Sequence, residues 1–200
     1  MTTHEFVRAA FPEPPARVLE IGCGPTGELA SALAADGFDV LAIDPVAPDG
    51  ALFRRARLED LEVGDGPFDA AVDVRSLHHL HHLGPAMELI VSLLPRGIFV
   101  VEEFAWDLAD EPTLVWFHAQ RGRATERGDL LLADWVDEHR GLHGDEALRG
   151  ALESRFETRT FERGPDLYHR LGAEARAAES AAIEAGAIRA IGFRWTGVPR

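Results

Sequence analysis

The residue types that this sequence lacks exclude several kinds of chemistry. Its 200 residues include no lysine and no asparagine, and all 20 basic residues are arginines. Without lysine the chain can form no Schiff base with pyridoxal phosphate, no lysine-containing phosphate loop and no tyrosine–lysine pair for hydride transfer. Without asparagine it has no N-glycosylation site. A single cysteine, Cys23, excludes an internal disulfide framework and a four-cysteine zinc site.

Charge and hydropathy limit the partners and the cellular location that we expect for this protein. The formal net charge is −14, so most of the surface would repel phosphate groups, and we expect no nucleic-acid partner. No apolar run approaches the ~20 residues needed to cross a bilayer, and residues 1–15 lack the basic and apolar pattern of a signal peptide. We therefore expect a cytoplasmic protein with no membrane partner. Length and composition predict one domain over residues 1–200.

The first half of the chain alternates between strand-like and helix-like segments. Short apolar runs end at glycine or at Asp-Pro, and alanine- and leucine-rich stretches lie between them. Near-continuous apolar strands that alternate with helices predict a parallel sheet covered on both faces. The expected strands are 17–21, 38–43, 52–58, 68–74 and 98–104, with helices at 27–35 and 85–94.

The second half has a different pattern. Residues 106–150 are mostly helix-like and interrupt the strand rhythm, which predicts a helical insertion within the same domain. Strand patterns return at 156–163 and within 187–198, on either side of an alanine-rich helix expected at 168–185.

A glycine-rich turn after the first strand indicates a ligand site. Gly22 and Gly24 allow close approach of a ligand to the backbone, and Asp44, at the end of the next strand, can accept both ribose hydroxyls of an adenosine ligand. With Gly27 the turn also matches the dinucleotide fingerprint, and a tight turn alone can show this spacing. Glu20 favours another adenosine cofactor, because a carboxylate repels a diphosphate and suits the cationic amine of S-adenosylmethionine.

Four motifs in order resemble the class I S-adenosylmethionine-dependent methyltransferases, of the small-molecule type. The resemblance covers residues 17–104. The segments that carry it are Val18–Gly24, Leu41–Asp44, Phe68–Val74 with Ser76–Leu80, and Leu93–Phe104. It implies an α/β fold: a Rossmann-like, doubly wound, mostly parallel sheet of about seven strands, with an antiparallel edge strand and helices on both faces.

The resemblance also implies roles for matching positions. Glu20 would hold the methionine end of the cofactor, Asp44 the ribose, and Glu59 or Asp60 the adenine amino group, with Leu58 or Leu61 beside the ring. An extra residue before Gly27, relative to the family's usual glycine spacing, leaves the role of that glycine open. The expected cofactor-binding residues are Glu20, Gly22, Cys23, Gly24, Asp44, Glu59, Asp60, Val74 and Arg75.

Histidines and a carboxylate supply the candidate catalytic groups. His78 follows the fourth strand, Glu103 lies near the end of the fifth, and His143 lies in a glycine-flanked loop of the insertion. Each can serve as a general base. His78, His79, His81 and His82 have spacings that a metal site would allow, but no acidic or cysteine ligand accompanies them in a zinc-type pattern, so we expect no metal.

These observations predict methyl transfer from S-adenosylmethionine to a small-molecule acceptor, with residues 106–150 as a lid over the acceptor. The absence of asparagine excludes the Asn-Pro-Pro-Tyr motif of amino-group DNA methyltransferases. Two alternatives remain open: a nicotinamide-dependent oxidoreductase and a non-catalytic cofactor-binding module. The acceptor, the atom methylated and the oligomeric state stay open as well.

Overall fold

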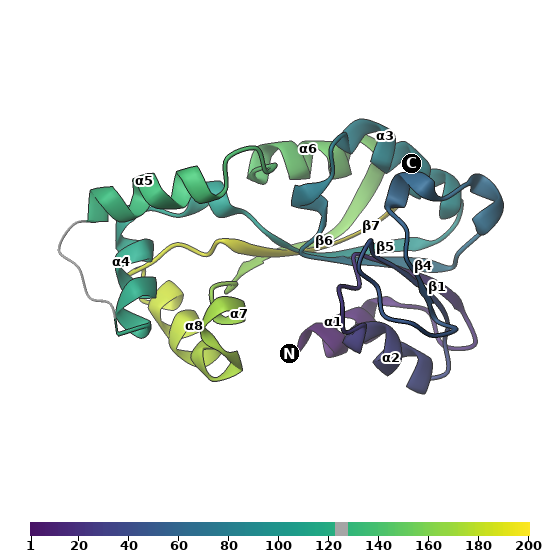
Figure 1. The fold of residues 1–200 in the computed structure, drawn as a ribbon, viewed down its shortest axis with the longest axis horizontal. Coiled ribbons are helices and arrows are strands. Elements are labelled where there is room, and N and C mark those ends of the chain that lie inside the picture. Colours follow the sequence, from purple (N-terminus) through teal and green to yellow (C-terminus); the bar gives the residue numbers. More distant parts are fainter. Residues whose placement is uncertain (123–127) are drawn as a thin grey trace.

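A computed structural model describes residues 1–122 and 128–200. Its centre is a seven-stranded sheet with the order β3-β2-β1-β4-β5-β7-β6 (Figure 1). Strands β1 to β5 are parallel, β7 is antiparallel to β5, and the edge strand β6 pairs antiparallel with β7. The predicted fold class is confirmed. The strands are β1 (Arg17–Ile21), β2 (Asp39–Ile43), β3 (Phe53–Arg54), β4 (Ala70–Val74), β5 (Ile98–Phe104), β6 (Phe156–Gly164) and β7 (Gly192–Pro199).

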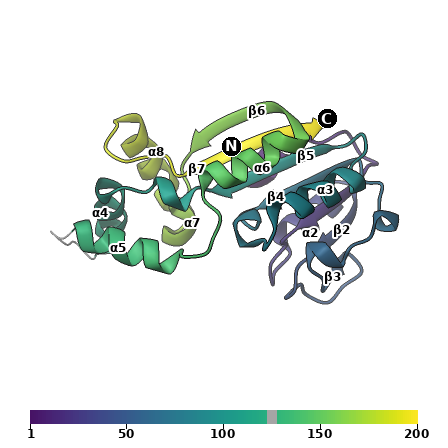
Figure 2. The same cartoon turned by 90° about the horizontal axis from the view of Figure 1, so that it is seen from above.

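Helices cover both faces of the sheet, as the continuous apolar strands predict. On one face α1 (Thr3–Ala10) and α2 (Glu28–Ala35) pack on alternate residues of the central strands, and on the other face α3 (Leu83–Leu93) and α6 (Asp145–Arg155) do the same. Figure 1 shows these two layers on either side of the sheet, and Figure 2 looks down on the layer that holds α3 and α6. In open α/β sheets of this kind, ligands bind at the carboxyl ends of the parallel strands.

Beyond β5 the chain builds a second group of helices, α4 (Glu111–Gln120) and α5 (Gly128–Glu138), which pack against each other. Their core is aromatic and aliphatic and includes Phe104 at the end of β5, Phe117 and Trp135. The helices α7 (Tyr168–Leu171) and α8 (Arg176–Glu184) lie beside this group in Figure 1. Residues 123–127 of the predicted insertion lie outside the described residues, and α6 continues past residue 150 to Arg155.

Two predicted elements were wrong in extent. The third strand was expected at 52–58 but pairs over Phe53 and Arg54 alone, because it is the sheet edge and the chain then turns into a short 3-10 helix, Leu58–Asp60. The helix expected at 168–185 is broken at Gly172, whose φ of +118° is outside the helical range. None of the helices among the described residues is long and apolar enough to cross a membrane.

Candidate active site

The glycine turn after β1 brings the chain back across the carboxyl end of the sheet. Gly22 has φ +76°, and a Cβ there would lie 2.3 Å from the Oγ of Ser76. Gly24 has φ +64°, and no atom outside its chain neighbours lies within 4 Å of where its Cβ would be. Glycine is favoured at this position by the backbone conformation and not by a lack of space. Ser76 follows β4, and its Oγ, which donates to Asp73, also lies 3.2 Å from the carbonyl oxygen of Ile21. The turn and the end of β4 therefore fit together only when residue 22 has no side chain.

Asp44 closes this turn from the neighbouring strand. Its Oδ2 accepts from the backbone N–H of Gly24 at 3.0 Å, and its Oδ1 accepts from the N–H of Val46 at 2.8 Å. A carboxylate has about four lone-pair positions, so both oxygens can accept further hydrogen bonds. The group is held in place by backbone donors and remains able to bind two hydroxyls.

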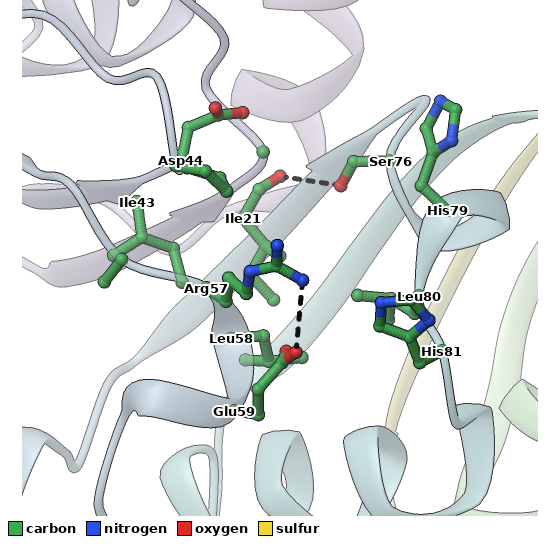
Figure 3. A pocket seen from close by; sticks show the side chains of 13 residues that line it. Ile21, Ile43, Asp44, Arg57, Leu58, Glu59, Ser76, His79, Leu80 and His81 are labelled. Atoms are coloured by element: carbon green, nitrogen blue, oxygen red, sulfur yellow. Dashed lines mark hydrogen bonds and ion pairs between the residues drawn. The ribbon is translucent and has the colours of Figure 1, made fainter.

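A cavity of about 260 Å³ lies beside Asp44, between the ends of β1 and β2 and the loop after β4 (Figure 3). Three predicted cofactor residues line it: Gly22, Asp44 and Glu59. Leu58, expected beside the adenine ring, is also in the wall, whereas Leu61 is not among the lining residues. The remaining lining residues are Ile21, Ile43, Pro45, Ala56, Arg57, Ser76, His79, Leu80 and His81.

Glu20 is not among the lining residues, but it directly precedes Ile21 and Gly22, which are, and its buried carboxylate is not fully paired. Its side chain is 3% exposed, and its Oε2 is buried with no hydrogen-bond partner among the described residues. Burial, together with the nearby charges of Asp73 and Asp44, raises its pKa to about 7. Such a group gains from a cationic ligand, which would both pair the orphan oxygen and favour the charged form.

The other predicted cofactor residues do not line the cavity. Asp60 accepts from the backbone N–H of Arg57 at 2.8 Å and so caps the short helix. The side chain of Val74 packs on the α1–α2 side of the sheet. Cys23 is buried on the same side, and burial raises the pKa of its thiol to about 12, so it is an unreactive packing group.

Arg75 points away from the cavity, toward the second half of the chain. It is the one non-glycine residue with positive φ (+58°) among the described residues. Its Nη1 pairs with the Oδ2 of the buried Asp166 at 2.5 Å, and its guanidinium lies 5.1 Å from the centre of the Phe104 ring. Arg75 therefore joins the end of β4 to the loop before α7.

His78 and Glu103 form a buried pair between β4 and β5. The Nδ1 of His78 lies 2.8 and 2.9 Å from the two carboxylate oxygens of Glu103, and the backbone N–H of His78 donates to the same carboxylate at 3.2 Å. Burial lowers the pKa of His78 to about 4 and raises the pKa of Glu103 to about 7. The imidazole is therefore neutral at pH 7, with Nδ1 turned to the carboxylate.

Asp73 completes a buried acidic group beside this pair. It is fully buried and accepts from Ser76 Oγ and from the backbone N–H groups of Ser76 and Leu77. Burial and the charge of Glu103 raise its pKa to about 7. His143, the third predicted base, lies elsewhere: its Nε2 is 2.8 Å from the carbonyl of Leu80, outside the cavity lining. Its catalytic role stays a prediction.

A family described as a methyltransferase domain matches residues 3–157, more than half of the sequence. The chain belongs to this methyltransferase family. The fold agrees: an S-adenosylmethionine-dependent methyltransferase of Mesorhizobium loti has a TM-score of 0.60 at 19% identity, with 97% of this chain and 95% of that chain covered. A geranyl diphosphate C-methyltransferase of Streptomyces coelicolor has a TM-score of 0.62 at 14% identity, with 98% and 78% covered. No curated protein sequence gives a significant match.

The predicted family, the predicted enzyme class and the predicted cofactor, S-adenosylmethionine, are confirmed by this membership. The residues present also fit the cofactor. Glu20 has a buried oxygen free to accept from a cationic amine, and Asp44, in the cavity wall, has oxygens that can accept from hydroxyls. Sequence reasoning missed four lining residues of the loop after β4: Ser76, His79, Leu80 and His81. Their position directly after a strand end was the available signal. Among the described residues, no group of three His, Cys, Asp or Glu side chains can hold a metal ion.

Proposed function

We propose that this methyltransferase transfers the methyl group to a small-molecule acceptor that carries a removable proton. The observation that supports this most is the buried pair between His78, in the loop after β4, and Glu103, near the end of β5. The net charge of −14 argues against a polyanionic acceptor such as nucleic acid. The Streptomyces neighbour, which acts on geranyl diphosphate, is a precedent for a small acceptor on this fold.

In this proposal the cofactor is held by three carboxylates. Asp44 would accept from the ribose hydroxyls, Glu20 would pair with the amine, and Glu59 would accept from the adenine amino group. When bound, S-adenosylmethionine would supply a sulfonium methyl group that the acceptor nucleophile takes up as the S–CH3 bond breaks and S-adenosylhomocysteine leaves. The protein's part is then to align the acceptor, exclude water and take up a proton.

His78 is the proposed proton acceptor. In its ionised form Glu103 accepts from the backbone N–H groups of His78 and Phe104 and from the ring, so the ring proton of neutral His78 then lies on Nδ1 and leaves the lone pair on Nε2. This arrangement fixes the tautomer and the orientation of the ring, as a base requires. We further propose that residues 106–150, which follow β5 at the carboxyl edge, close over the acceptor, and that the enzyme works in the cytoplasm without a metal.

The experiment is turnover of an acceptor found by screening small nucleophiles with labelled cofactor. His78→Gln should lower kcat about 100-fold or more, because general-base catalysis contributes 10²–10⁴-fold. Glu103→Gln should lower kcat and shift the pH profile, and His143→Gln serves as the comparison for a base outside the pair. Unchanged kcat in His78→Gln, or loss of turnover with a chelator and its return with zinc or magnesium, would overturn the proposed base or the metal-free mechanism respectively.

A further inference from the structure

The loop that forms one wall of the cofactor cavity is also where the helical insertion joins the rest of the protein. Residues 75–82 connect β4 to α3, and Ser76, His79, Leu80 and His81 of this loop line the cavity. The segment 139–144, between α5 and α6, bonds to two carbonyl groups of this loop. One short loop therefore contacts both the cofactor site and the insertion.

Both bonds come from His143. Its backbone N–H donates to the carbonyl of His78 at 3.1 Å, and its ring Nε2 lies 2.8 Å from the carbonyl of Leu80. Because a carbonyl oxygen can only accept, Nε2 carries the proton and donates. The insertion thus contacts the loop at two carbonyl groups, those of His78 and Leu80. The Nε2 atom of His143 is already used as a hydrogen-bond donor.

The segment that carries His143 is fixed at both of its ends. The N–H of Leu142 donates to the carbonyl of His139 at 3.1 Å, and the His139 ring packs 4.2 Å from the ring of Trp135 in α5. At the other end, the N–H of Asp145 donates to Oδ1 of Asp107 at 2.8 Å. A shift of the insertion is therefore passed to His143 and from it to the cavity wall.

We propose that His143 is a positioning residue that couples the insertion to the cofactor cavity through the Leu80 carbonyl. The proposal rests on S-adenosylmethionine occupying this cavity. A cofactor in contact with Leu80 and His81 holds the loop, and the held loop orders the segment 139–144. By linkage, a well-placed insertion strengthens cofactor binding by the same factor. The acceptor-side helices and the cofactor site are thus not independent.

The test measures S-adenosylhomocysteine binding and amide hydrogen exchange in the full chain, without an acceptor. His143→Ala removes the ring donor and should weaken binding about three- to tenfold, the size expected for one hydrogen bond. His143→Gln can place an amide N–H near the same carbonyl and should restore most of the affinity. In the wild type, binding should slow exchange in residues 77–82 and also in 139–144; in His143→Ala the protection of 139–144 should be lost.

A matched control is Thr160→Val, which removes the 2.8 Å hydroxyl contact between Thr160 and Thr196 at the β6 edge of the sheet. It should leave affinity and ligand-induced protection as in the wild type. Protection of 139–144 that persists in His143→Ala, or affinity that falls equally in Thr160→Val, would overturn the coupling. A wild-type protein that fails to bind S-adenosylhomocysteine would overturn the cofactor assignment and this proposal with it. If the wild type binds S-adenosylhomocysteine and the protection of residues 139–144 is the same in His143→Ala, the coupling proposal alone is overturned.

Discussion

The two halves of this methyltransferase use their buried carboxylates differently. In the parallel half, Glu20 has a buried oxygen without a partner and directly precedes Ile21 and Gly22, which line the candidate cofactor cavity. In the second half, the fully buried Glu179 accepts from three backbone N–H groups at 2.7–2.9 Å, and Asp166 is paired with Arg75. Asp145 of α6 also has a buried oxygen without a partner, but its other oxygen is bonded to Arg163. Glu20 therefore keeps an acceptor oxygen for a ligand, whereas Glu179 and Asp166 hold the chain of the second half together.

The largest expected effect is on stability, at Glu179. Glu179→Ala leaves the N–H groups of Asp166, Leu167 and Tyr168 buried without their acceptor, so the free energy of unfolding should fall by about 3–5 kcal/mol. Urea denaturation measures this. Affinity of the folded variant for S-adenosylhomocysteine should stay within about threefold of the wild type, and a parallel loss of affinity would break the distinction between the two halves.

Two glycines of the turn, Gly22 and Gly24, distinguish the cost of a steric overlap from the cost of a strained backbone. Gly22→Ala adds a Cβ that would overlap Ser76, and it strains a positive φ, so we expect a loss of about 2–4 kcal/mol in unfolding free energy. Gly24→Ala adds strain alone and should cost about 1–2 kcal/mol. Equal losses in the two variants would mean that Ser76 adapts and that the fit between the turn and β4 is loose.

Asp44→Ala tests the ribose site. It removes two charge-assisted hydrogen bonds to the ligand, and binding of S-adenosylhomocysteine should weaken by about 1–3 kcal/mol in calorimetry. Asp60→Ala is the control, because Asp60 lies outside the cavity lining and caps a short helix. A larger loss of affinity in the control than in Asp44→Ala would place the adenosine elsewhere.

The smallest expected effect is a pH dependence from Glu20. Its pKa is raised from 4.5 to about 7 in the folded protein, so it is mostly protonated below pH 7. A cationic amine favours the carboxylate, so binding releases this proton. Affinity should therefore rise with pH between 5.5 and 7, by at most about tenfold per unit. Glu20→Gln should flatten the slope relative to the wild type; an unchanged slope would mean that another group titrates.

Much of the fold could be predicted because the parallel half follows general rules. Apolar runs, glycine turns and the four motifs placed β1, β2, β4 and β5 within two residues of their observed bounds. The local sequence pattern predicted the wrong extent for elements whose bounds depend on tertiary contacts. The third strand has a partner for two residues only, and the break at Gly172 accompanies the contact of Glu179 with the start of α7.

The candidate site was predictable in part for the same reason. Gly22, Asp44 and Glu59 follow strand ends, and strand ends of a parallel sheet meet at one edge. The sequence could not show that Arg75 turns toward Asp166, 91 residues away, or that His143 reaches the Leu80 carbonyl, 63 residues away. Such pairings depend on how the insertion packs, for which the sequence carries no periodic signal.

The most direct test of the account is calorimetric titration of the wild-type protein with S-adenosylhomocysteine and, separately, with NADH. We expect micromolar binding of S-adenosylhomocysteine, about −7 to −9 kcal/mol, because Asp44 offers a carboxylate to the ribose and Glu20 offers one to the amine. We expect no comparable binding of NADH, whose diphosphate would be repelled by Glu20. Tight NADH binding with no response to S-adenosylhomocysteine would contradict it.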